Sequence, residues 1–275
     1  MRLRASVYVA TDVWKAAETA DRHLIRAWAI APELPGSSVF SHQTAALIHG
    51  WPLIGGITDR VHVIDETLRG VEHRAGVVRH GAAGPPPDRA PGRFDGVPVA
   101  DAVSTAVLLA TTLEPHVAAV AVDSAVRAGQ VDVDRFTRAL PAGPSRGSRR
   151  ARLVSMALDA RHESAGESFT AIRLIEHGVR SIEPQHEFRT GERIDRVDFW
   201  LPDLGVVVEF DGKQKYVDPA MLGNRSPQEA LWQEKLREDR IRSQPGVRTV
   251  IRVTWWHLLE PDRLRALFRA HGVLL

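Results

Sequence analysis

Two short apolar runs in the second half of the chain are interrupted by acidic residues. Residues 194–216 read I-D-R-V-D-F-W-L-P-D-L-G-V-V-V-E-F-D-G-K-Q-K-Y, with β-rich runs at 196–200 and 206–210 around a Leu-Pro-Asp-Leu-Gly turn. This pattern predicts a β-hairpin. Strand side chains alternate between faces, so Glu209 and Asp211 project together, and Asp198 lies in the partner strand. We expect the three carboxylates to converge at one end of the hairpin.

The elements around this hairpin suit a mixed sheet flanked by helices. A helix with a buried stripe begins after residue 164, a first strand covers 182–189, and a highly charged helix covers 227–242. A further buried strand at 250–254 and a helix at 261–270 close the chain. The order helix, three strands, helix, strand, helix predicts an α+β domain with helices on its sheet.

The first half of the chain is richer in helical patterns than in strands. Apolar spacing predicts helices at 13–30, 102–110, 115–128 and 132–140, and short strands at 3–10, 60–64 and 76–80. The Gly- and Pro-rich residues 81–98 are expected to form an irregular loop. The run P-A-G-P-S-R-G-S-R-R then indicates a linker. We predict a mainly helical domain at 1–142, a basic linker at 143–152 and a second domain at 153–275.

Composition removes several classes of protein. The 275 residues are 44% hydrophobic and 25% charged, as in ordinary globular proteins. The absence of cysteine excludes disulfides, thiolate zinc sites and thiol catalysis. The sequence has no run of about 18 apolar residues and no apolar leader, which argues against membrane insertion and export. These features fit a cytoplasmic protein.

The acids of the hairpin have two interpretations. Acidic side chains in strands usually face solvent, as on the outer side of an edge strand. The run V-V-V-E-F-D, however, is apolar enough for a buried central strand, where an unpaired acid costs several kcal/mol unless a metal or a cation neutralises it. Mg²⁺ prefers carboxylate oxygens, so Asp198, Glu209 and Asp211 form a candidate site for Mg²⁺ or Mn²⁺.

The chain has Asp198 in one strand, Glu209 a strand length later and lysines beyond it. This arrangement resembles the PD-(D/E)XK nuclease superfamily. The run V-V-E-F-D-G-x-x-K-Y looks like its branch related to very-short-patch repair endonucleases. The resemblance implies a restriction-endonuclease-like core and metal-dependent cleavage of DNA. Asp211 stands where that pattern has its lysine, so the catalytic cation is Lys213 or Lys215, or is absent.

The same resemblance implies a further acid from the helix before the hairpin. Glu167 is our choice and Glu163 the substitute. Either residue is equally explained as an acid that interacts favourably with a helix N-terminus.

Basic residues are candidates for nucleic-acid contacts. The chain has 36 Lys and Arg residues and a sequence pI of about 9.3, although its net charge is only +2. The candidates are Arg149, Arg150, Arg193, Arg196 and Lys235. Cations of the helix at 227–242 either pair with its own acids or track a phosphate backbone.

Residues 1–140 resemble, more loosely, the AbiEi-type antitoxin and transcriptional regulator family. The likeness rests on V-Y-V, V-F-S-H-Q-T-A-A-L-I-H-G-W-P-L and V-P-V-A-D-A-V-S-T-A-V-L-L-A; the winged helix that usually opens that family has no counterpart here. Within this run, Ser41 is expected to cap a helix and His42 to serve capping or packing rather than catalysis.

Three functions follow as hypotheses. The first is an Mg²⁺-dependent endonuclease acting on DNA. The alternative is a non-catalytic DNA-binding regulator or antitoxin that retains a nuclease-like fold, with a toxin or antitoxin protein as partner. An RNA-directed nuclease or toxin differs from the first only in its substrate.

Overall fold

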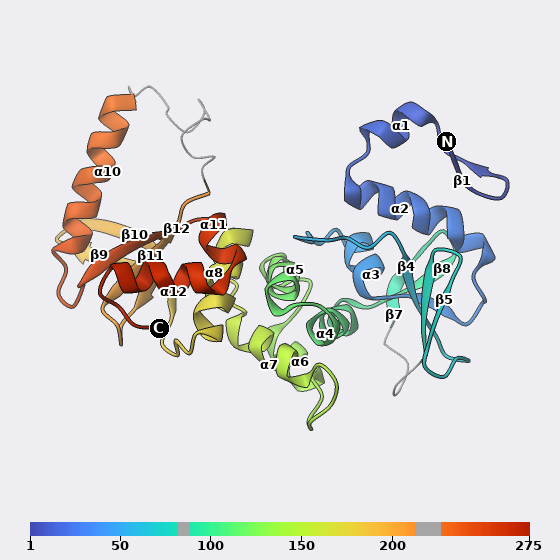
Figure 1. Ribbon diagram of the computed structural model, residues 1–275. Coiled ribbons are helices and arrows are strands. Elements are labelled where there is room, and N and C mark those ends of the chain that lie inside the picture. Colours follow the sequence, from blue (N-terminus) through green and yellow to red (C-terminus); the bar gives the residue numbers. More distant parts are fainter. Residues whose placement is uncertain (82–88, 213–226) are drawn as a thin grey trace. The chain divides into compact units, whose positions relative to one another are not determined.

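The chain divides into two compact units. The computed structural model describes residues 1–81, 89–212 and 227–275. Met1–Leu158 forms the N-terminal unit and Asp159–Leu275 the C-terminal unit. Both contain helices and mixed β-sheet (Figure 1), which confirms the predicted α+β class.

The C-terminal unit is built on a four-stranded sheet with the strand order β12-β11-β10-β9. Its strands are β9 (Glu183–Thr190), β10 (Arg193–Leu201), β11 (Val206–Phe210) and β12 (Thr249–Val253). Strands β9, β10 and β11 are antiparallel neighbours, and β12 runs parallel to β11. The helices are α8 (Ala165–Glu176), α10 (Pro227–Arg242), α11 (Trp255–Leu259) and α12 (Pro261–Ala270). The order of elements is the one that the apolar pattern predicts.

Strand β11 is central and buried, as its apolar run predicts. Val206, Val207 and Val208 have no exposed surface. Val207 packs in a cluster with Ile241 of α10, whereas Phe210 packs under the first turn of α8. Because Val207 and Phe210 point to opposite faces of the strand, α8 and α10 cover opposite faces of the sheet.

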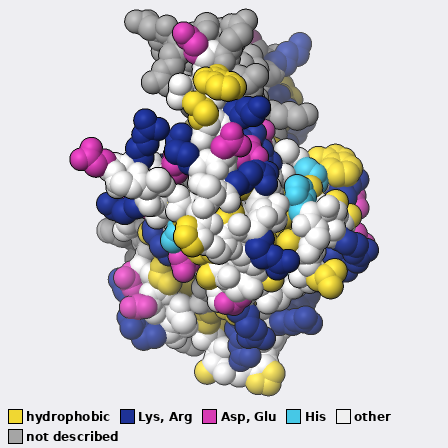
Figure 2. Space-filling model, turned by 90° about the vertical axis from the view of Figure 1, so that its left-hand side faces the viewer, with side chains coloured by type: hydrophobic (Ala, Val, Ile, Leu, Met, Phe, Trp, Pro, Cys, Tyr) yellow, Lys and Arg dark blue, Asp and Glu magenta, His cyan; other side chains and the backbone are white. Residues whose placement is uncertain are grey.

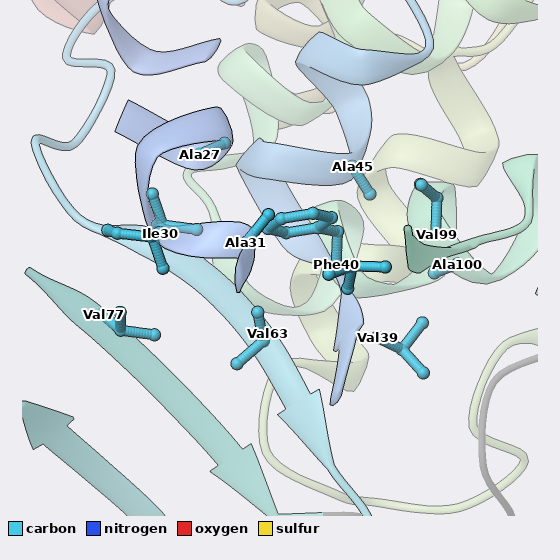
Figure 3. Close-up of a cluster of buried hydrophobic side chains, with 12 residues drawn as sticks. Ala27, Ile30, Ala31, Val39, Phe40, Ala45, Val63, Val77, Val99 and Ala100 are labelled. Carbon is cyan, nitrogen blue, oxygen red and sulfur yellow. The ribbon is translucent and has the colours of Figure 1, made fainter. Parts of the chain in front are cut away.

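The N-terminal unit contains more strand than the sequence predicts. Its six-stranded sheet has the order β5-β6-β4-β3-β8-β7, and β1 and β2 form a separate pair. The strands are β1 (Arg2–Arg4), β2 (Val7–Tyr8), β3 (Ser38–Phe40), β4 (Val61–Asp65), β5 (Val71–Arg74), β6 (Val77–Gly81), β7 (Arg89–Phe94) and β8 (Val97–Ala100). Figure 3 shows the apolar core around Phe40, which packs with Ile30, Val63, Val77 and Val99.

Of the irregular loop expected at residues 81–98, residues 89–98 belong to the hairpin of β7 and β8, and residues 82–88 lie outside the described residues. The turn of this hairpin is Asp95–Gly96, and both residues have left-handed φ angles, of 46° and 79°. Two left-handed residues make the turn that suits a two-residue hairpin, and Asp-Gly is a strong sequence signal for it. The described part of this Gly- and Pro-rich segment is therefore a regular hairpin and not an irregular loop.

The helices of the N-terminal unit match the predicted ones except at two places. They are α1 (Thr11–Ala16), α2 (Thr19–Ile30), η1 (Ala31–Glu33), α3 (His42–Ile48), α4 (Ala102–Thr112), α5 (Pro115–Arg127), α6 (Val133–Ala139) and α7 (Ser148–Ala157). The helix expected at 13–30 is thus two helices, separated by an extended Ala17 and Glu18. None of the described helices is both long and apolar enough to cross a bilayer.

The second difference concerns the basic linker expected at 143–152, where residues from 148 onward belong to α7. Ala151, Val154 and Ala157 are buried at helical spacing, and α7 packs against α4 and α5. The two units divide after Leu158. The buried apolar residues between the arginines therefore form a helix, although Gly, Pro and Ser precede them.

Candidate functional site

Asp198 and Glu209 are neighbours at the end of the β10–β11 hairpin. The backbone ladder pairs Phe199 with Val208, so Asp198 and Glu209 stand one step beyond the last paired residues. The Asp198 Oδ2 atom accepts a hydrogen bond of 2.7 Å from the Phe210 backbone N–H. The structure thus brings together two of the acids that the sequence places in the site, and Asp211 follows directly on β11.

Strand β10 departs from regular alternation at Asp198. Val197 and Trp200 both pack in the apolar cluster under α10, although residues three apart in a regular strand face opposite ways. Gln185 of β9, which stands opposite Asp198 in the register, has a left-handed φ of 54°. Irregularities of this kind redirect a side chain, and the Asp198 carboxylate is accordingly turned toward the end of β11.

Arginines from two other elements neutralise Glu209, whose side chain is only 14% exposed. Arg237 of α10 donates a hydrogen bond of 2.7 Å to Glu209 Oε1. Arg252 lies beside Glu209 in the parallel β11–β12 register, with its Nε 3.9 Å from Glu209 Oε2. Burial alone lowers the pKa of Arg237, but the hydrogen bond and charge of Glu209 outweigh it and hold that pKa above its ordinary value. The cation that the buried acid requires is therefore supplied within the chain.

The two arginines also join Glu209 to acids of α10. Arg237 pairs with Glu234 at 3.3 Å, and Arg252 pairs with Glu234 at 2.9 Å and with Glu238 at 3.0 Å. The sequence analysis did not select Arg252. Its signal is an arginine inside the apolar strand run V-I-R-V, which requires an acid within reach once the strand is buried.

Asp195 is a buried acid of β10 that is not among the site residues predicted from the sequence. It is 6% exposed, and Arg240 of α10 donates two hydrogen bonds to it, of 2.9 and 2.7 Å. The bonds from Arg240 lower the pKa of Asp195 and outweigh the opposite effect of burial. Arg237 and Arg240 thus point to the sheet and do not track a phosphate backbone along the outside of α10.

Glu167 has a complete set of hydrogen-bond donors at the start of α8. Its Oε1 accepts from the Ser164 hydroxyl at 2.7 Å, and its Oε2 accepts from the Glu163 N–H at 2.9 Å and from the Gln185 amide at 2.7 Å. The Ser164 hydroxyl in turn accepts from the Glu167 N–H at 3.2 Å. Ser164 is thus the N-cap of α8, and Glu167 binds both its hydroxyl and the backbone of the residue before it. The helix-capping interpretation of Glu167 accounts for its position, while Gln185 links it to the residue opposite Asp198.

The two lysines proposed as catalytic cations, Lys213 and Lys215, lie outside the described residues. Asp198 and Glu209 are neighbours in the register and Asp211 follows on β11, but the oxygens of the three acids do not all lie within 4.8 Å of one another, contrary to the convergence expected from the sequence. Carboxylate oxygens from neighbouring strands suit a hard cation such as Mg²⁺ or Mn²⁺. Glu209 Oε1 is bonded to Arg237, and its Oε2 lies 3.9 Å from Arg252 Nε, so an ion at Oε2 would lie beside a second arginine.

The basic residues proposed for nucleic-acid contacts are exposed and belong to two different units. Arg193 and Lys235 are exposed, and Arg196 pairs with Glu163 at 3.0 Å. Arg149 and Arg150 belong to α7 of the other unit, where Arg150 pairs with Glu114 at 3.1 Å. Figure 2 likewise shows Lys and Arg side chains interspersed with acids. Any basic surface here is therefore mixed with negative charge.

Comparison with known proteins gives relatives without a stated function. The chain is 27% identical over 221 residues to uncharacterized proteins of two Mycobacterium tuberculosis strains, MT2308 of CDC 1551 / Oshkosh and Rv2248 of H37Rv. The match covers 77% of this chain and 78% of each relative. No family model matches the chain. No solved structure matches it either.

Proposed function

We propose that the protein is a metal-dependent nuclease that hydrolyses DNA phosphodiester bonds in its C-terminal unit. The observation that carries the proposal is the adjacency of Asp198 and Glu209 at the end of a buried hairpin. Central strand β11 carries Glu209 and is followed by Asp211, and Asp198 of β10 is the register neighbour of Glu209. The resemblance of this run to the PD-(D/E)XK superfamily supports the same chemistry.

In this proposal Asp198 and Glu209 hold Mg²⁺ or Mn²⁺, with Asp211 completing or positioning the shell. A bound Mg²⁺ lowers the pKa of a water ligand and polarises a phosphate oxygen. Arg237 fixes Glu209 through Oε1, and an ion bound at Oε2 takes the place of Arg252 beside that oxygen. Lys213 or Lys215 is assigned to stabilise negative charge that develops on the phosphate.

Glu167 has a positioning role in this proposal rather than a direct metal contact. Its bonds to Ser164 and Gln185 fix the start of α8 against β9. Gln185 stands opposite Asp198, so a shift of Glu167 is transmitted to the strand that carries the first acid. Arg193, Arg196 and Lys235 are candidates for phosphate contacts, which predicts binding that weakens with salt.

A second function is favoured by the bond between Arg237 and Glu209. Because an arginine already neutralises the buried acid, the fold needs no metal for stability. This pairing suits a non-catalytic DNA-binding regulator or antitoxin that retains a nuclease-like fold. RNA as the substrate stays open in either case.

The deciding experiment compares cleavage by the wild-type chain and by Asp198→Asn and Glu209→Gln. Supercoiled plasmid, linear duplex, single-stranded DNA and RNA are incubated with Mg²⁺, with Mn²⁺ or with chelator. Asp203→Asn is the matched control, because this acid lies in the turn of the same hairpin and bonds Ser181 instead. We expect metal-dependent cutting of DNA that the first two substitutions abolish and the control retains.

The other outcomes also discriminate. Cutting that survives both Asp198→Asn and Glu209→Gln contradicts the assigned site. Binding of DNA without cutting under any metal condition favours the regulator, and cutting confined to RNA changes the substrate class.

A further inference from the structure

Three histidines of the N-terminal unit meet although they come from three different elements. His42 begins α3, His62 lies in β4 and His80 in β6. One ring nitrogen from each lies within 4.8 Å of the other two. The His62 Nδ1 and His80 Nε2 atoms are 3.0 Å apart, and the rings of His42 and His80 stack with centroids 4.0 Å apart.

The sheet register explains why two of these side chains share a face. Strands β4 and β6 are parallel, and His62 pairs with Val78 while Ile64 pairs with His80. Paired residues and those two apart point the same way, so both histidines project from one face. That face, together with Arg60, lines a pocket of about 1890 Å³ within the N-terminal unit.

His42 reaches the same point through an uncommon backbone conformation. Its φ is 50°, a left-handed value that is rare outside glycine and occurs at functional sites. Ser41 occupies the N-cap position but makes no side-chain cap bond, contrary to the sequence expectation. Its hydroxyl lies 2.9 Å from His42 Nδ1 instead, so the ring is oriented with Nε2 as its remaining ligand atom. Metal-binding histidines are commonly held by such a bond to the other ring nitrogen.

Burial disfavours the charged form of all three rings. Burial, reinforced by the neighbouring histidines, lowers the pKa of His42 well below its usual value and that of His62 to about 3. Burial also lowers the pKa of His80, with a contribution from His73. Neutral imidazole is the form that binds metals.

We propose that His42, His62 and His80 bind one divalent transition-metal ion, with Zn²⁺ as the best chemical fit and a fourth position open to the pocket. Imidazole nitrogens favour zinc over magnesium, and three protein ligands with an open position are typical of reactive zinc sites. Tetrahedral Zn–N bonds place ligand nitrogens about 3.3 Å apart, which small side-chain rotations achieve here. This site is separate from the acids proposed for Mg²⁺.

The test is metal binding by the full chain prepared without an affinity tag. Zinc content is measured after chelator treatment and dialysis against Zn²⁺, and Co²⁺ serves as a spectroscopic probe of nitrogen ligands. We expect one tightly bound ion, and His42→Gln, His62→Gln and His80→Gln should each weaken binding more than about 100-fold. His73→Gln is the matched control, since His73 lines the same pocket and contacts Arg60; it should bind normally.

Two further comparisons make the result decisive. Asp198→Asn with Glu209→Gln should leave the Zn²⁺ site intact, so failure of the nuclease proposal does not affect it. Circular dichroism identifies any histidine variant that fails to fold. For such a variant, the Co²⁺ spectrum of the wild-type chain decides whether nitrogen ligands hold the ion. A six-coordinate oxygen-type spectrum, or retention of the ion by all three folded variants, overturns the proposal in favour of a simple His62–His80 hydrogen bond.

Discussion

Arg237 of α10 and Glu209 of β11 form a hydrogen-bonded ion pair of 2.7 Å directly beside Asp198. The pair has two consequences. It satisfies an acid in a buried strand, and it leaves the other oxygen of that acid to Arg252 at 3.9 Å or to a metal ion that replaces it. The proposed nuclease requires a metal ion at Glu209 in addition to Arg237, whereas the proposed regulator requires none.

Replacement of Arg237 by glutamine should make stability depend on Mg²⁺. Without the arginine, Glu209 loses its nearest cation, and we expect a loss of about 1–3 kcal/mol in the free energy of unfolding. Mg²⁺ should restore part of this loss by supplying the missing charge, so it should stabilise the variant more than the wild type. Thermal unfolding with Mg²⁺ and with chelator measures the difference.

A control for this prediction lies on the same helix. Arg242 is 45% exposed and pairs with Glu238, which Arg252 also holds, so Arg242→Gln should cost less than about 0.5 kcal/mol and show no added response to Mg²⁺. If Mg²⁺ stabilises Arg237→Gln no more than the wild type, the proposed metal site loses its main support.

Glu167→Gln should weaken the start of α8 more than it weakens metal binding. A neutral amide cannot accept all three hydrogen bonds that the carboxylate accepts, which predicts a loss of about 1–2 kcal/mol in unfolding free energy. An indirect role predicts at most about a tenfold fall in Mg²⁺ affinity. Denaturant unfolding and metal titration of the same preparation measure both.

Glu163→Gln is the comparison for Glu167. Glu163 is exposed and bonds only Arg196 among the described side chains, so its replacement should change neither quantity appreciably. Complete loss of Mg²⁺ binding by a folded Glu167→Gln variant would instead make Glu167 a direct ligand.

The C-terminal unit could be predicted well because its signals are local. A buried strand with continuous valines, a turn of Pro and Gly, and a helix start each occupy a few consecutive residues, and α8 begins after Ser164 as the sequence predicts. The partners of the acids could not be predicted in the same way. Arg237 meets Glu209 across 28 residues, and only the packing of α10 on the sheet selects that arginine over its neighbours.

In the N-terminal unit, contacts between residues far apart in the sequence could be predicted even less. Strands β4 and β6 are parallel with β5 between them in sequence, an arrangement that no local pattern indicates. The meeting of His42, His62 and His80 follows from that register and from the left-handed backbone of His42. Nothing in the spacing of these histidines along the chain points to it.

Gly166→Ala should disrupt the contact between α8 and β11. A Cβ atom at this position would lie 2.1 Å from the ring of Phe210, far inside contact distance. Because the ring is buried beside Trp255, we expect a loss of about 1–3 kcal/mol from overpacking, and reduced cleavage through displacement of the residues next to Glu209.

Rescue by a smaller neighbour tests that explanation. Phe210→Leu alone should be destabilising, yet combined with Gly166→Ala it should cost less than the sum of the two changes. A coupling energy of at least about 0.5 kcal/mol in urea unfolding is expected for residues in contact. Strict additivity would show that the methyl group is accommodated by movement of the helix instead.

Asp65 should make the N-terminal unit sensitive to acid. Its carboxylate is fully buried and accepts hydrogen bonds from Arg79 at 2.6 Å and from the Thr67 hydroxyl at 2.7 Å. Burial by itself raises the pKa of Asp65, but the bonds from Arg79, Thr67 and Ser37 outweigh it and hold that pKa well below its usual value. The ionised form is therefore the one that the fold stabilises.

The direction of the pH effect follows from this depressed pKa. Above the unfolded pKa of about 3.9 the stabilising contribution is complete, and it is lost as the pH falls further, because the unfolded chain binds a proton that the folded chain does not. Asp65→Asn should cost on the order of 3 kcal/mol at pH 7 and progressively less below pH 4. Urea unfolding at pH 7, 4 and 3 measures this change, with Asp59→Asn as the control, since Asp59 is 85% exposed in its pair with Arg26. An Asp65→Asn cost that is equal at pH 7 and pH 3 would mean that the carboxyl group has the same pKa in the folded and the unfolded chain.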